Sequence, residues 1–254
     1  MKRIVSLFCG TLIVGSLFPI SAQKSLTYLY EISPAPWEES FGNHRAVLKV
    51  SKPAEVVSLD FEWRRPDRDV EQRRFLIVNA ETGDTVPNIR RVEITNEHCH
   101  LRFGPVAKKG EYYFYYLPYQ VQHGYGFYGG GYLSQESAPD SSWLQRMETV
   151  KKVPKALVTK VQSRQAFDSF YPMEVAATLK ERESYMQKND RPWLLFPEDR
   201  RNQIRMRSDI PVKWLADKQG REFKGEAAPN EYYTFQIGLW AGKGEATSVT
   251  YEVT

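Results

Sequence analysis

Several short segments of this chain alternate apolar and polar side chains with the two-residue period of a half-buried β-strand. The pattern is clearest over residues 57–63, where every second residue from Val57 to Trp63 is apolar and those between are polar. Turns at short intervals separate the segments, as is typical of an antiparallel sandwich. We therefore predict a mainly β fold, with an N-terminal antiparallel β-sandwich over residues 23–150. Further predicted strands of this region cover residues 44–50, 74–79, 91–95, 100–103 and 111–117.

The pattern changes after Trp143. A strand is predicted over residues 158–162, and an amphipathic helix over about 172–188, because Val175, Leu179 and Met186 line one side of it. Another possible strand covers residues 210–215. We assign residues 151–224 to a connector that contains one helix.

The last segments read as strands again. Residues 231–241, EYYTFQIGLWA, form a strong strand pattern, and residues 247–253 read as its partner. An isolated two-stranded hairpin is marginally stable at best, and an uncovered apolar edge invites association. We interpret residues 225–254 as the first strands of an incomplete second β-domain, and expect the chain to be the front part of a larger protein.

The N-terminus has the pattern of a secretory signal peptide. Lys2 and Arg3 precede an almost wholly apolar stretch over residues 4–18, and small residues lead to a cleavage point before Gln23. The apolar stretch is too short to span a bilayer comfortably. We therefore expect residues 1–22 to be a signal peptide, and the protein to be exported, periplasmic or extracellular, with no membrane span once the signal is removed.

Removal of that signal changes the charge and the cysteine count. Loss of Lys2 and Arg3 lowers the formal net charge from +4 to +2, and no long run of like charge suggests a nucleic-acid partner. Cys9 is also lost, so Cys99 is the only cysteine of the mature chain. An intrachain disulfide is therefore excluded, and stability must come from an ordinary core.

Aromatic residues are frequent, with 15 Tyr and 6 Trp, and they suit both half-buried strands and flat sugar ligands. A glycine-rich stretch over residues 119–142 has no clear periodicity and is long for a structureless loop, which makes it a functional candidate. Its rings could stack on sugar faces or pack onto a neighbouring domain, and both readings stay open. The candidate contact residues are Tyr119, Tyr125, Phe127, Tyr128 and Tyr132.

Catalytic and metal sites are poorly supported by the residue patterns. Glycoside hydrolysis needs two carboxyl groups around one bond, and Glu198 with Asp199 is an adjacent acidic pair. Two arginines follow it, so a salt-bridged loop is the simpler interpretation. His98 and His100 share one face of a predicted strand, but a metal site needs further ligands from elsewhere. We assign no catalytic residue, no metal and no cofactor.

Five segments, in their order and spacing, resemble the N-terminal region of secreted bacterial proteins related to glycoside hydrolase family 123. They are FEWRR at 61–65, GEYYFYYLPY at 110–119, FYPMEV at 170–175, LFPEDR at 195–200 and YYTFQIG at 232–238.

The resemblance implies β-N-acetylgalactosaminidase-like enzymes with an N-terminal β-sandwich, followed by a (β/α)-barrel in which an adjacent Asp-Glu pair acts. This sequence has no Asp-Glu dipeptide, and Glu198-Asp199 has the reverse order. We expect this chain to be a non-catalytic accessory portion that has no activity on its own. Its expected partner is a glycan or a catalytic domain absent from these residues. The alternative is a stand-alone glycan-binding module that uses the aromatic loop.

Overall fold

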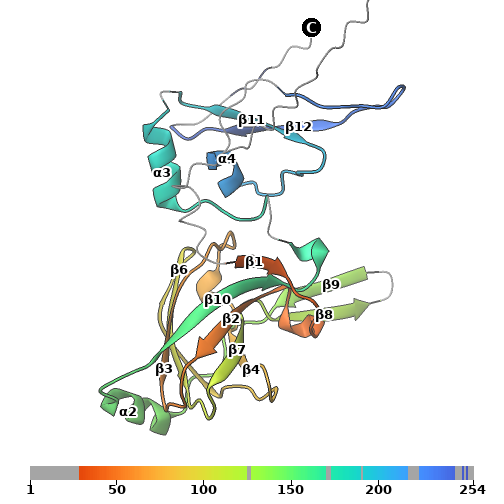
Figure 1. Cartoon of the computed structure of the whole chain (residues 1–254). Helices are drawn as coiled ribbons and strands as arrows, with labels where there is room; N and C mark the ends of the chain where they lie inside the picture. The colour runs from red at the N-terminus through yellow and green to blue at the C-terminus, as the bar shows by residue number, and fades with distance from the viewer. Residues whose placement is uncertain are drawn as a thin grey trace, which may run out of the picture.

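The computed structural model describes residues 29–124, 127–169, 173–189, 191–216 and 223–243, together with Ser248 and Thr250. The predicted signal peptide, residues 1–22, lies outside the described residues. Strands predominate over helices, and most of them belong to one large curled sheet below a smaller α/β unit (Figure 1). The predicted mainly β fold is confirmed.

The large sheet has eight strands in the order β4-β7-β2-β10-β3-β6-β5, with β1 added beside β10. Neighbouring strands of this sheet run antiparallel, except that β10 pairs in parallel with both β1 and β3. The strands are β1 (Leu29–Ile32), β2 (His44–Val50), β3 (Val57–Glu62), β4 (Leu76–Asn79), β5 (Asn88–Ile94), β6 (His98–Gly104), β7 (Gly110–Tyr115) and β10 (Lys155–Ser163).

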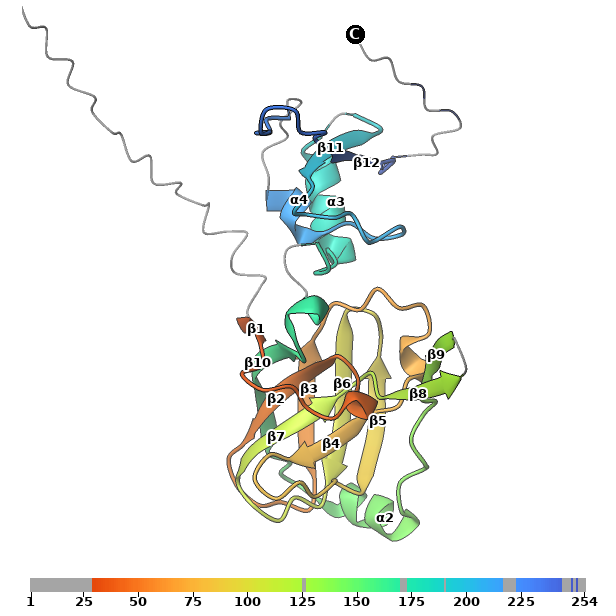
Figure 2. The same ribbon diagram turned by 90° about the vertical axis from the view of Figure 1, so that its right-hand side faces the viewer.

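Strand β10 joins the two halves of the sheet. Its C-terminal part pairs with β2 and β1, whereas Lys155 and Ala156 pair with β3. The register against β2 shifts between Val158 and Lys160, and such an irregularity lets a strand bend from one layer into the other. The sheet therefore folds over itself as a sandwich (Figure 2).

Apolar faces of both halves meet in one aromatic-rich core. Trp63 lies edge-on to Phe75 with ring centroids 5.8 Å apart, and Phe75 meets Phe114 in the same way at 5.3 Å. The alternation predicted from Val57 to Trp63 is confirmed, since all four apolar residues are at most 3% exposed. Cys99 is buried in this core, and burial raises the pKa of its thiol.

The sequence pattern places the end of the sandwich at residue 150, whereas the structure adds β10 to it. Residues 158–162 do form a strand, but its place within the sheet depends on pairing with segments about 100 residues earlier in the chain. Periodicity shows which side chains face inward and does not identify the neighbouring strand.

The stretch 119–142 is not a structureless loop. It forms a hairpin of β8 (Tyr119–Gly124) and β9 (Phe127–Tyr132), which projects from the side of the sandwich, and it leads to α2 (Ser141–Thr149) (Figure 2). Asp140 caps α2 by accepting a hydrogen bond from the Trp143 amide at 2.9 Å. The fully buried Trp143 ring donates to the Glu55 carbonyl, so α2 closes one end of the sandwich.

The second half of the chain forms a smaller unit with its own core. It contains α3 (Leu179–Gln187), β11 (Leu194–Asp199), α4 (Val212–Ala216) and β12 (Phe235–Trp240). The helix predicted over about 172–188 begins only at Leu179, because Thr178 and Glu181 form a reciprocal capping box there. The strand predicted over residues 210–215 is wrong, because α4 occupies most of that segment.

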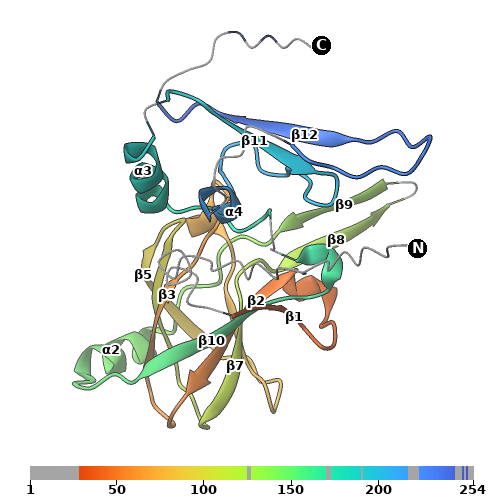
Figure 3. The same ribbon diagram turned by 45° about the horizontal axis from the view of Figure 1, so that its top comes forward.

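The partner of β12 also differs from the expectation. β12 pairs antiparallel with β11, with Leu194 opposite Trp240 and Asp199 opposite Phe235. The expected partner, residues 247–253, lies almost wholly outside the described residues. The connector and the last strand are therefore parts of one unit, and the β11–β12 ribbon spans it (Figure 3).

A small set of polar contacts joins this unit to the sandwich. The Arg64 guanidinium forms a two-pronged ion pair with Glu181 of α3, at 2.5 and 2.9 Å, and also donates to the Ala176 carbonyl. Glu97 accepts a hydrogen bond from the Leu179 amide at 2.5 Å. These contacts hold the start of α3 against the loops at one end of the sandwich.

Candidate functional site

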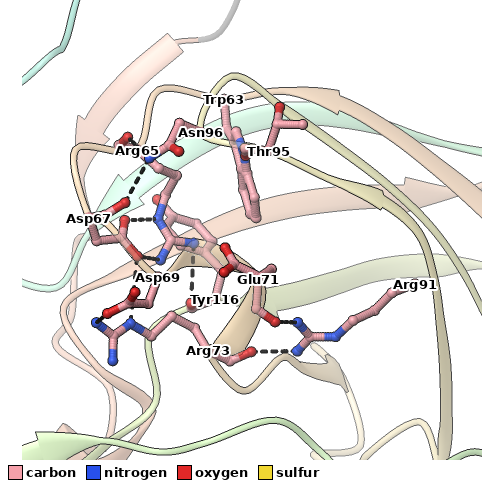
Figure 4. A network of polar contacts seen from close by, with 10 residues as sticks. All are labelled: Trp63, Arg65, Asp67, Asp69, Glu71, Arg73, Arg91, Thr95, Asn96 and Tyr116. Atoms are coloured by element: carbon pink, nitrogen blue, oxygen red, sulfur yellow. Dashed lines mark hydrogen bonds and ion pairs between the residues drawn. The ribbon is translucent and has the colours of Figure 1, made fainter.

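The loop after β3 carries a fixed cluster of arginine and aspartate side chains, drawn in Figure 4. The Arg65 guanidinium is buried and donates to both carboxylate oxygens of Asp67, at 2.7 and 2.6 Å. It also lies 4.8 Å from the ring centroid of Trp63 and 5.0 Å from that of Tyr116. A buried charge needs such partners, and here they hold the loop in one conformation.

Neighbouring groups extend this cluster toward the projecting hairpin. The Asn96 amide donates to the backbone carbonyls of Arg65 and Asp67, at 2.8 and 2.7 Å. Arg73 lies 3.7 Å from the Asp67 carboxylate, and its guanidinium covers the Tyr132 ring at 4.9 Å from the centroid. The charged loop therefore lies between the hairpin on one side and the start of α3 on the other.

The structure brings two of the five candidate rings together. Tyr119 and Tyr132 face each other across the hairpin, with centroids 5.6 Å apart in an edge-to-face arrangement. Phe127 and Tyr128 belong to β9, and only their backbone is described, whereas Tyr125 lies outside the described residues. The Tyr119 ring also covers Gly130, where an added Cβ would lie 2.2 Å from its hydroxyl oxygen.

This geometry favours packing over sugar stacking. A flat sugar needs an open ring face, whereas Tyr119 meets Tyr132 edge-on and Arg73 covers a face of the Tyr132 ring. Tyr132 is still 46% exposed, so part of it remains accessible. Tyr132 therefore packs against both Tyr119 and Arg73.

The acidic pair does not converge on one point. Glu198 and Asp199 are successive residues of β11, so their side chains leave opposite faces of the strand. The Glu198 carboxylate is 3% exposed and accepts hydrogen bonds from Lys213 Nζ and Trp214 Nε1, both at 2.8 Å. Asp199 accepts from the Tyr233 hydroxyl and from Arg201, which lower the pKa of its carboxyl. Both groups are committed to structural contacts.

The outer face of the β11–β12 ribbon is apolar and exposed. Residues on the inner face, such as Leu194 and Phe196, pack on Trp214 of the unit's core. Those between them point away, and register places Leu195 opposite Leu239. The outward apolar side chains are Trp193, Leu195, Phe235, Ile237 and Leu239, between 39% and 59% exposed. We call this set the ribbon face.

The described part of the chain offers few other groups that could bind a metal ion or another ligand. No group of three or more His, Cys, Asp or Glu side chains is placed there to hold a metal ion. His98 is bound to carboxylates instead, at 2.8 Å from Asp60 and 3.3 Å from Glu93. None of the helices described in the structure has the length and apolar character needed to cross a membrane.

Sequence reasoning missed the charged cluster and anticipated only part of the ribbon face, as an uncovered apolar strand over residues 231–241. The cluster was not predicted, because nothing local shows that Arg65 is buried between Trp63 and Tyr116. Its alternating arginines and aspartates over residues 64–74 were the available signal. The ribbon face depends on the pairing of β11 with β12. These strands are not neighbours in the sequence pattern, since 35 residues lie between Asp199 and its partner Phe235.

Comparison with known proteins gives one match. A family model described as "Glycoside hydrolase 123, N-terminal domain" matches residues 35–164, just over half of the chain. The matched range contains every strand from β2 to β10, and it ends one residue after β10. No protein of curated function and no solved structure matches the chain.

Proposed function

The chain belongs to the family of glycoside hydrolase 123 N-terminal domains, and from this premise we propose that it is a non-catalytic accessory portion of an exported glycoside hydrolase, which supports a catalytic barrel. The family match covers the curled sheet except β1, and it supports the accessory role. The barrel, the export and the glycan are the parts of this proposal that need experiments.

The ribbon face is the observation that carries the proposal of a docked domain. A two-stranded ribbon that faced water on its outer side would alternate apolar inward and polar outward residues. Here Leu195, Ile237 and Leu239 are apolar and point outward, on the face opposite Leu194 and Phe196 of the inner core. A contiguous exposed apolar patch of this kind is typical of a protein–protein contact.

The hydrolase itself provides the most economical partner. An N-terminal domain of a glycoside hydrolase precedes the rest of that enzyme, and strands β11 and β12 lie at the end of the molecule remote from the sandwich (Figure 1). A catalytic domain that covered Ile237 and Leu239 would remove their apolar surface from water. Docking would also hold the smaller unit, and through Arg64 the sandwich, in a defined position.

The first test is an activity assay with chromogenic β-N-acetylgalactosaminide and related glycosides. We expect no turnover by the chain, because the Glu198 carboxylate is bound by Lys213 and Trp214, and Asp199 leaves the opposite face of the strand. The Glu198→Gln variant is assayed in parallel. Turnover that disappears in this variant would contradict the accessory role and make Glu198 a catalytic residue.

The second test measures docking with a separately purified family 123 catalytic barrel by calorimetry. We expect binding by the wild-type chain and at least a tenfold loss, about 1.4 kcal/mol, in Ile237→Lys, which places a charge in the ribbon face. Val92→Lys is the matched control, because Val92 is 51% exposed on β5 of the large sheet. Equal loss in both variants, or no binding at all, would argue against the ribbon face as the docking site.

Export is proposed from the sequence of residues 1–22, which resembles a signal peptide. Expression of the full chain in a Gram-negative host, followed by mass spectrometry of the periplasmic fraction, should give a product that begins at Gln23. An uncleaved product confined to the cytoplasm would contradict export without affecting the docking proposal.

A further inference from the structure

A polar cleft separates the sandwich from the smaller unit beside the Arg64–Glu181 ion pair. Its cavity measures about 360 Å³ and lies between the loop at residues 64–68 and the segments around the start of α3 and Asp209. Small-molecule sites occur preferentially at such junctions, and their volumes begin at roughly 300 Å³. The size therefore suits one or two sugar rings.

Most charges that line the cleft are already paired. Arg64 is bound to Glu181, Arg65 to Asp67, and the Glu97 carboxylate accepts from the Leu179 amide. These contacts satisfy the groups concerned, and none of them is available for a ligand without breaking a bond of 2.5–2.7 Å. The remaining charged groups of the lining decide what the cleft can bind.

Those groups are Arg68 and the loosely paired Arg182 and Asp209. The buried Arg182 Nε has no hydrogen-bond partner among the described residues, and Arg182 Nη1 lies 3.8 Å from Asp209, beyond hydrogen-bond distance. Arg68 is exposed, and no ion pair or hydrogen bond to its side chain is found in the described parts of the chain. Because Nε is enclosed by protein, a ligand would contact Arg182 through its terminal guanidinium nitrogens, and the side chain is 28% exposed where it lines the cleft.

We propose that this cleft binds a sugar that carries an oxyanion, either a carboxylate or a sulfate ester, through Arg182 and Arg68. Guanidinium groups match the planar or tetrahedral oxygens of such anions. Asn96 and Ser208 add polar groups for sugar hydroxyls, whereas none of the described lining residues is aromatic, so a neutral ring has no stacking surface. The proposal that the ligand is a saccharide rests on the family assignment. It does not depend on docking of a catalytic barrel, so either proposal can be overturned without the other.

The experiment is calorimetric titration of the full chain, at low salt, with four probes: glucuronate, glucose 6-sulfate, glucose and inorganic sulfate. Arg182→Gln and Arg68→Gln remove the two proposed donors. Arg90→Gln is the matched control, because Arg90 is exposed on β5 and does not line the cleft. Circular dichroism checks that Arg182→Gln keeps its fold, and Arg68→Gln tests an exposed residue whose replacement leaves the core intact.

We expect saturable binding of glucuronate or glucose 6-sulfate, weaker at high salt, and at least a tenfold loss of affinity in each cleft variant, about the effect of one charge-assisted hydrogen bond. Arg90→Gln should bind as the wild type does. Equal affinity for glucose would overturn the role of the oxyanion. Equal affinity for inorganic sulfate would overturn the saccharide, and unchanged binding in both cleft variants would overturn the site.

Discussion

The buried charged side chains of Arg45 and Glu198 each have their own hydrogen-bond partners. Arg45 is 8% exposed, yet it donates to Gln162 at 2.8 Å and lies 3.6 Å from the ring centroid of Tyr113. Glu198 is held by Lys213 and Trp214 in the smaller unit. Because removal of one partner from a buried charge costs more than the pair contributes, such residues are structural anchors rather than spare chemistry.

Gly238 is a residue whose small size is required. The Trp214 ring stacks on Phe196 with centroids 4.4 Å apart and passes so close to Gly238 that an added Cβ would lie 2.4 Å from it. We expect Gly238→Ala to destabilise the smaller unit by about 1–3 kcal/mol through overpacking. Urea unfolding followed by tryptophan fluorescence measures this. Gly131→Ala should be nearly neutral, because no atom lies within 4 Å of its added Cβ.

His44 predicts a pH dependence of stability. Burial lowers the pKa of its imidazole to about 4, while its Nε2–H donates to the Asp168 carbonyl at 2.7 Å. An unfolded histidine titrates near 6.5, so below that pH the unfolded state binds the extra proton. The free energy of unfolding should therefore fall by about 2–3 kcal/mol between roughly pH 6.5 and 4.

Urea titrations at several pH values test this. The His44→Gln variant should lose most of the pH dependence of the free energy of unfolding. His98 should act with the opposite sign, since hydrogen bonding to Asp60 raises the pKa of His98. Its contribution is complete below the unfolded pKa and is lost as pH rises through the folded pKa. A His44→Gln variant with an unchanged pH profile would contradict the assignment.

At the scale of elements, the β8–β9 hairpin depends on contacts with the loop beside it. The Arg74 amide donates to Leu133 at 3.0 Å, and Arg73 covers Tyr132. An isolated two-stranded hairpin has little stability of its own. These contacts explain how a glycine-rich segment without periodicity still forms two strands.

Tyr132→Ala should therefore loosen the hairpin. The change removes the edge-to-face contact with Tyr119 and the cation–π contact with Arg73, each worth about 0.5–1.5 kcal/mol. Hydrogen exchange of the β8 and β9 amides should become faster by about tenfold, whereas exchange in β2 should not change. Saturable binding of a neutral sugar that disappears in Tyr132→Ala would instead support a glycan-binding hairpin.

For the whole molecule, the coupling of the two units is concentrated in few contacts. The side chains of Arg64 and Glu181 are only 9% and 20% exposed, so their ion pair is better shielded from solvent than most surface pairs. The same end of the sandwich carries the cleft proposed to bind an acidic sugar. We therefore expect a change in the position of the smaller unit to change the access to the cleft as well.

A double-mutant cycle of Arg64→Ala with Glu181→Gln measures this coupling. We expect an interaction free energy of about 1–3 kcal/mol, and separate unfolding of the two units in the double variant, because the pair spans the junction. Calorimetry resolves one transition or two. Strictly additive single effects would show that other contacts hold the units together. Arg205→Ala, which removes an exposed pair with Glu174, is the control.

The sequence by itself determined the mainly β class, most strand positions of the sandwich and the inward face from Val57 to Trp63, because alternation along a strand is a local property. It also indicated the family through five ordered segments. Only the tertiary structure decided that β10 closes the sheet, that β12 pairs with β11, and that Glu198 and Asp199 point apart. Those outcomes depend on which distant segments meet, and so do the ribbon face and the cleft, since each is made by segments that no local pattern joins.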